Sequence, residues 1–170
     1  MSIISQTISV LLLITCFLGC GLTGCRVNNS TVTTQQEIVR QSEALSKEYL
    51  QADVRYAKEC LEKDAKLLEG ATVLEPSGRA QLLALTYFRL YSLEKRTGNE
   101  LAAKARLIKA RYWRLTKAEL AGVKQDEAVN EIEQLTSDRI LDEVEQFDRK
   151  HNNGSPAKYV LSVKQTATKK

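Results

Sequence analysis

The residues whose side chains could react are few, and they form no catalytic set. The chain of 170 residues contains four cysteines and a single histidine, His151. A metal site needs several ligands close together, and neither a second histidine nor a nearby cysteine accompanies His151. The same lone imidazole cannot complete a nucleophilic triad with a neighbouring acid. The acid pairs Asp126-Glu127 and Asp142-Glu143 lack other features of a glycosidase site, so we expect a solvated or ion-paired helix face. The sequence therefore predicts no enzymatic activity, no metal and no dissociable cofactor.

Three of the four cysteines are grouped near the amino terminus. Cys16, Cys20 and Cys25 lie in or directly after an apolar segment, and only Cys60 lies in the body of the chain. Cys60 stands on an apolar stripe with helical spacing, which predicts a buried and unreactive thiol. An intermolecular disulfide is the alternative for this thiol.

The apolar segment ends in a motif that could carry a covalent modification. Residues 1–24 contain no charged side chain, as in the apolar region of a secretory signal. They end in Leu22-Thr23-Gly24, followed by Cys25, and this motif resembles the lipobox of bacterial membrane lipoproteins. The resemblance implies that Leu22, Thr23 and Gly24 form the recognition signal and that cleavage leaves Cys25 as the first residue. It also implies that Cys25 carries a diacylglycerol thioether and an N-linked acyl chain.

Three alternatives to this interpretation remain open. Residues 1–7 lack the usual Lys or Arg, which leaves a start further upstream possible. Residues 17–20 offer a second motif that fits the lipobox less well. An uncleaved helix over residues 3–22 would be close to the ~20 residues needed to span a bilayer. Arg26 follows Cys25 where Asp is the familiar inner-membrane retention signal, so we expect an outer-membrane lipoprotein that faces the periplasm.

Composition predicts an all-α fold. Only two prolines and eight glycines interrupt a chain rich in Ala, Leu, Glu, Lys and Arg. We expect an acylated cysteine and flexible tether at 25–34, a helical domain at 35–151 and a basic, flexible tail at 152–170. The domain is predicted to be a small bundle of four or five antiparallel helices.

Apolar spacing places the helices and their faces. The predicted helices cover 35–69, 79–96, 100–121 and 123–150, the last with a break at Thr136-Ser137. The segment 79–96 is apolar on nearly every side, so it should be the central helix. In the third helix, the residues predicted to face inward are Leu101, Ala105, Ile108, Tyr112 and Leu115. In the tail, residues 159–163 could form a short strand or dock on the body.

A second resemblance lies within residues 82–115. The residues that carry it are Leu90, Tyr91, Gly98, Ala103, Leu107 and Ala110. Their spacing is similar to part of a tetratricopeptide repeat, in which small residues let two antiparallel helices pack closely and a glycine opens the turn. Glu94 departs from the pattern, which usually has a large aromatic residue there, and no second copy follows. The resemblance implies one TPR-like helical hairpin and a protein-binding scaffold.

Charge is distributed in blocks, although the net charge is only +4. Residues 79–124 contain 11 basic and three acidic side chains, and residues 125–148 contain nine acidic and one basic. Residues 149–170 contain six basic side chains. Such blocks indicate neighbours within the fold or a charged partner. Nucleic acid is an unsuitable partner outside the cytoplasm, despite the basic segment.

A candidate binding surface lies on the third predicted helix. Trp113 falls opposite the apolar face of this helix, with Arg106, Lys109 and Lys117 around it. A tryptophan within a basic ring could bind an anionic partner. Alternatively, the acidic fourth segment covers this face and Trp113 is a core contact.

The sequence predicts a lipid-anchored, periplasm-facing helical scaffold that binds or helps to assemble an unidentified envelope protein. The alternative is a structural surface lipoprotein that contacts anionic lipid or wall polymers through residues 100–121 and the basic tail. The oligomeric state is left open.

Overall fold

The structure is a computed structural model that describes residues 29–167, and the side chains of residues 34–163. All described residues lie in helices or in the links between them, so the chain is all-α as predicted. The predicted leader, the lipobox and residues 25–28 of the predicted tether lie outside the described residues.

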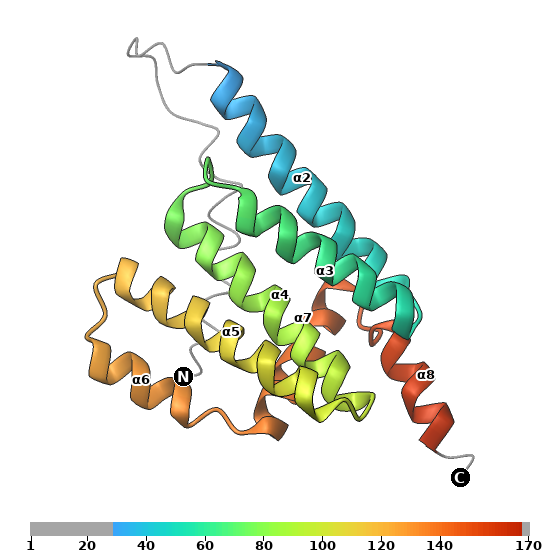
Figure 1. Ribbon diagram of the computed structural model, residues 1–170. Coiled ribbons are helices and arrows are strands. Elements are labelled where there is room, and N and C mark those ends of the chain that lie inside the picture. Colours follow the sequence, from blue (N-terminus) through green and yellow to red (C-terminus); the bar gives the residue numbers. More distant parts are fainter. Residues whose placement is uncertain (1–28, 168–170) are drawn as a thin grey trace.

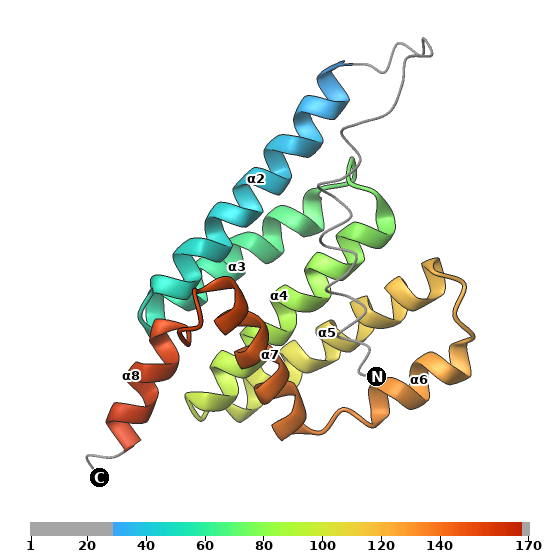
Figure 2. The ribbon, with the colours of Figure 1, turned by 180° about the vertical axis from the view of Figure 1, so that it is seen from behind.

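Between residues 29 and 167 there are seven helices, and not the four or five that we predicted. They are α2 (Asn29–Gln51), α3 (Val54–Gly70), α4 (Pro76–Arg96), α5 (Glu100–Leu120), α6 (Gln125–Glu133), α7 (Ser137–His151) and α8 (Lys158–Ala167). Helices α2, α3, α4 and α5 follow one another side by side in alternating directions (Figure 1). Helix α7 lies on the opposite face, against α4, and α8 contacts α2, α3 and α4 (Figure 2).

The first predicted helix, 35–69, is two helices. Its pattern continues across the break, but Asp53 is extended and its carboxylate accepts a hydrogen bond from the backbone N–H of Tyr56 at 3.0 Å. A short polar side chain that caps the following turn is a preferred start for a helix. The chain therefore reverses at Ala52 and Asp53, and apolar residues of both helices contribute to one core cluster.

Both ends of the described chain are more ordered than predicted. Helix α2 begins at Asn29, so residues 29–34 of the predicted tether are helical. The predicted tail contains α8, so residues 159–163 form no strand, and the alternative that they dock on the body is confirmed. Ala157, Tyr159 and Val160 are buried in the core shared with α2, α3 and α4, and this burial fixes the helix in place.

Caps explain the other helix boundaries. Helix α4 starts at Pro76, three residues before its predicted start, because the Glu75 carboxylate accepts hydrogen bonds from the N–H groups that follow. The predicted break in the fourth segment is confirmed, although Thr136 caps α7 in place of Ser137. The turn after α4 needs Gly98, whose φ of +80° is in the left-handed region.

Helix α4 is the centre of the fold, as predicted. It buries 11 of its 21 residues, including four that are polar or charged. One apolar cluster joins it mainly to α2, α3 and α8, and a smaller cluster joins it to α5 and α7. Within the larger cluster, Cys60 is 1% exposed, and burial followed by the charge of Glu48 raises the pKa of its thiol. The prediction of a buried thiol is confirmed.

A buried polar network crosses this core. The guanidinium of Arg89 forms an ion pair with Asp148 at 2.8 Å, and both side chains are at most 4% exposed. The Tyr49 hydroxyl donates to the second oxygen of Asp148 at 2.6 Å, and Arg89 also donates to Ser46 at 2.9 Å. Burial, then the negative charge of Asp148, raises the pKa of Tyr49 well above its usual value. The network ties α2, α4 and α7 together through satisfied hydrogen bonds.

Replacing Arg89 alone should destabilise the protein strongly. The Arg89→Met variant leaves the Asp148 carboxylate buried without its counter-charge, so we expect the free energy of unfolding to fall by about 3–5 kcal/mol. The double variant Arg89→Met/Asp148→Leu should recover most of this loss, because neither charge then remains buried. Urea denaturation followed by circular dichroism measures both values. A loss below about 1 kcal/mol in the single variant would contradict the account.

Candidate functional site

Helix α5 packs on α4 through its small residues. Ala103 and Ala110 are 1% and 0% exposed, and Leu107 lies between them, half-buried in the smaller apolar cluster. Alanines let two helix axes approach closely, and α4 and α5 accordingly form the most extensive helix pair in the described structure. These three residues belong to those that carry the resemblance to the tetratricopeptide repeat.

The face of α5 that we predicted to point inward is exposed instead. Leu101 is 82% exposed, Ile108 70% and Tyr112 59%. At ~100° per residue these side chains lie on the opposite side of the helix from Ala103 and Ala110. Because only one of the two faces can pack on α4, the face with small residues is buried and the face with large residues is left in solvent.

We call this exposed face the α5 stripe. It consists of Leu101, Ala105, Ile108, Tyr112 and Leu115, of which only Leu115 is half-buried. The stripe spans 15 residues, and its ends are ~21 Å apart along the helix at a rise of ~1.5 Å per residue. Single apolar side chains on a protein surface are common, but several large ones along one face of a helix form a candidate binding surface.

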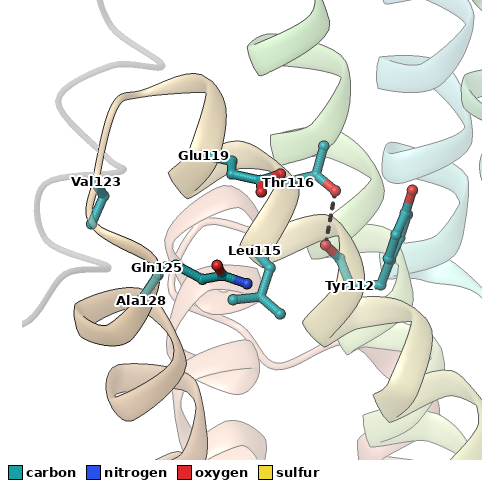
Figure 3. A pocket seen from close by; sticks show the side chains of 7 residues that line it. All are labelled: Tyr112, Leu115, Thr116, Glu119, Val123, Gln125 and Ala128. Carbon is teal, nitrogen blue, oxygen red and sulfur yellow. Dashed lines mark hydrogen bonds between the residues drawn. The ribbon is translucent and has the colours of Figure 1, made fainter.

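A hollow of about 190 Å³ lies at the carboxyl-terminal end of the stripe, between α5 and α6 (Figure 3). Its apolar lining comes from Tyr112, Leu115, Val123 and Ala128, and Glu119 lies at its polar side. Tyr112 is held by an edge-to-face contact with Trp113, with ring centroids 5.0 Å apart. The hollow is therefore continuous with the stripe, since Tyr112 and Leu115 belong to both.

Two basic residues border one side of the stripe. Lys104 and Arg111 are seven residues apart, so they lie on the same side of α5. Their neighbours Arg106, Lys109 and Arg114 all form ion pairs, whereas no carboxylate among residues 34–163 pairs with Lys104 or Arg111. The Nε of Arg111 is also buried without a hydrogen-bond acceptor. This edge of the stripe is therefore positively charged and has unused donors.

The basic side chains predicted to surround Trp113 are paired or partly buried within the protein. Arg106 pairs with Glu62 of α3, and Lys109 pairs with Glu69 of the same helix at 3.2 Å. Lys117 is half-buried, and burial together with the charge of Arg114 lowers its pKa. These residues do not surround an exposed ring. Helix α3, and not the acidic fourth segment, supplies the acids that face Arg106 and Lys109.

Trp113 itself is a core contact. Its ring is half-buried against the larger apolar cluster, and the Arg79 guanidinium lies 5.6 Å from the ring centroid. The alternative in which Trp113 is a core contact is therefore correct about the burial of its ring. Helix α5 thus has a large side chain, Trp113, on the side of α3 and small alanines on the side of α4.

Hydrogen bonds hold the basic side of α5 to α3 and α4. The Tyr87 hydroxyl donates to Glu69 at 2.6 Å and accepts from Lys109 at 2.9 Å. These bonds, led by the one from Tyr87, lower the pKa of Glu69, and the bond to Tyr87 also raises the pKa of Lys109. All three groups keep their usual charge states at neutral pH, so they fix the rotation of α5 about its axis.

Within residues 29–167, no group of three or more His, Cys, Asp or Glu side chains is arranged to hold a metal ion. His151 stacks on Phe147 at the end of α7, with ring centroids 4.2 Å apart, and its Nδ1 bonds to the Phe147 carbonyl.

The helices described are all too short or too polar to cross a bilayer. Leu22, Thr23, Gly24 and Cys25 lie outside the described residues.

Comparisons with protein-family models, with curated proteins and with solved structures gave no match to this chain. The α5 stripe is therefore derived from the geometry of this chain alone. Sequence spacing identified its residues but placed them on the wrong side of the helix. The signal that could have corrected this was the second set on the same helix, Ala103 and Ala110, which lies on the opposite face.

Matched substitutions on the two faces of α5 test this orientation. Ile108→Glu places a carboxylate in solvent, so we expect the free energy of unfolding to change by no more than about 0.5 kcal/mol. Ala110→Glu places the same carboxylate at the α4 interface, where an unpaired charge should cost about 3 kcal/mol or more. Urea denaturation of both variants decides between the faces. A larger loss at Ile108 than at Ala110 would show that α5 is turned the other way.

Proposed function

We propose that this protein is a lipid-anchored scaffold that holds an envelope protein against the α5 stripe and catalyses no reaction. The observation that carries the proposal is the exposure of Leu101, Ile108 and Tyr112 on one face of α5, while the opposite face of this helix is packed against α4. Burying such a band against a partner gains ~25 cal/mol per Å² of apolar surface removed from water. The resemblance of the α4–α5 hairpin to a protein-binding repeat supports the same class of function.

The anchor is the second part of the proposal. Acylation of Cys25 with at least two chains would hold the protein stably in a bilayer, since each buried methylene gains ~0.8 kcal/mol. Arg26 in place of an aspartate favours the outer membrane, with the body facing the periplasm. Only residues 26–28 separate Cys25 from the first described residue of α2.

Helix α2 changes how the body would be held. With 23 residues at ~1.5 Å each, it is ~35 Å long, and its later part is packed on α3. We infer that a helix, which includes residues 29–34 of the predicted tether, carries the body. A helix of this kind would keep the α5 stripe at a defined distance from the lipid surface.

The alternative function, contact with anionic lipid or wall polymers, relied on basic residues of α5 and of the tail. Arg106 and Lys109 are paired with α3 acids, and Lys117 is half-buried, so these three side chains offer little free charge to a polymer. Within residues 34–163, Lys104 and Arg111 keep unpaired charge, but they lie beside the exposed apolar side chains. The apolar character of the exposed face favours a protein partner.

Lipid attachment is tested at the cysteine. The Cys25→Ser variant has no thiol for the thioether, so it should not incorporate labelled palmitate and should accumulate as an uncleaved precursor. A Cys20→Ser variant serves as the matched control and should be labelled and cleaved normally. Labelling that persists in Cys25→Ser and disappears in Cys20→Ser would move the attachment site to Cys20.

Docking at the stripe is tested in intact cells. A photoreactive residue replacing Ile108 should form one defined adduct with an envelope protein, because its side chain would be covered by the partner. The same residue replacing the exposed Lys47 of α2 should not form this adduct. If illumination gives no adduct at Ile108, or the same adducts at both positions, the stripe is not a docking surface.

A further inference from the structure

We propose that the element bound by the α5 stripe is an amphipathic helix with an acidic edge. This inference rests on the proposed docking function and specifies the chemistry of the partner. Its apolar side would lie along Leu101, Ile108 and Tyr112, and its carboxylates would face Lys104 and Arg111. One bulky apolar side chain would enter the hollow between α5 and α6.

The shape of the surface favours a helix. The stripe is straight and ~21 Å long, and it offers side chains but no row of free backbone groups. An extended strand laid on it would leave its own N–H and C=O groups without partners, whereas a helix satisfies these groups internally. A helix with apolar residues at every third or fourth position presents a band of matching width. A partner of about four turns would cover the whole stripe.

The charges at the border favour an acidic partner. Lys104 is exposed and Arg111 half-buried, and neither forms an ion pair with the residues whose side chains the structure describes. Two acids seven residues apart on the partner would lie opposite both cations. The Arg111 guanidinium would gain an acceptor by turning toward such a carboxylate, since its Nε lacks one in the free protein. A carboxylate binds this group with two parallel hydrogen bonds.

The same charges argue against a second copy of this chain. An antiparallel two-fold pairing of α5 with itself would place the border of Lys104 and Arg111 against the same basic border of the other copy. Like charges in such positions destabilise a helix pair. A flat anionic bilayer is also a poor match, since it would not fill the hollow and would approach Glu119 at its polar side.

Two synthetic peptides of about 18 residues provide the probe, since this length gives about 27 Å of helix. Both carry leucines at helical spacing, and they differ only in the flanking residues, which are Glu in one and Lys in the other. Fluorescence anisotropy measures their binding to the full chain, held by its lipid in nanodiscs of a zwitterionic phospholipid. We expect the Glu peptide to bind at least about tenfold more tightly than the Lys peptide.

Variants of the protein assign this preference to the stripe. Ile108→Glu should weaken the Glu peptide at least about tenfold, because it places a like charge in the apolar band. Lys104→Glu/Arg111→Glu should reverse the preference, so that the Lys peptide binds more tightly. The matched control, Lys47→Glu/Lys63→Glu, changes the net charge equally on α2 and α3 and should leave the preference unchanged. Circular dichroism confirms that each variant is folded.

Three results would overturn the inference: no binding of the Glu peptide, equal binding to Ile108→Glu, or no reversal in the charge-swapped variant. Binding of the chain to vesicles of an anionic phospholipid that is lost in Ile108→Glu, without peptide binding, would assign the stripe to the membrane. Sedimentation of a dimer that Ile108→Glu dissociates would assign it to a second copy. If the peptides fail while the Ile108 adduct still forms in cells, docking stands and only the acidic helix is wrong.

Discussion

The buried ion pair between Arg89 and Asp148 is the contact on which the arrangement of the helices depends. Two charges removed from water are costly unless each is paired and hydrogen-bonded, so α7 must return to α4 at a fixed position. Tyr49 extends this requirement to α2, and its ring lies 5.7 Å from that of Tyr159 in α8. These contacts occupy the sides of α4 that face α2, α7 and α8. Helix α3 packs on a further side of α4, and α5 packs on the side that remains.

The exposed stripe follows from how α5 meets α4. Ala103 and Ala110 allow the two helices to approach closely, while Arg106 and Lys109 reach from α5 to the acids of α3. Alanines and paired cations thus fill the buried side, and the bulky apolar residues face solvent. A soluble fold would normally reverse this pattern, with large apolar residues inside. In α5 the large apolar residues are exposed and the small ones are buried. This reversal is the reason that our functional proposal concerns α5.

Sequence patterns predicted the helical class, the central position of α4 and the break before α7, because each depends on local propensity, caps and spacing. They missed the division at Asp53, since the apolar period continues across it and only the capping geometry separates α2 from α3. They left open whether residues 159–163 form a strand or dock on the body, because the order of α8 depends on burial of Tyr159 among residues over 60 positions away. The rotation of α5 was ambiguous because both of its faces carry apolar residues. Only the tertiary packing decides which face is buried.

The central claim is that the α5 stripe is free in the isolated protein and covered in the envelope. The rate at which a maleimide modifies Ile108→Cys measures this directly, with Lys47→Cys as an exposed reference and the buried Cys60 as the background. We predict similar rates for both introduced thiols in the purified protein. In envelopes from cells, Ile108→Cys should react at least about tenfold more slowly than Lys47→Cys, because burial in an interface blocks access to the thiol. Equal rates in the envelope would contradict the account.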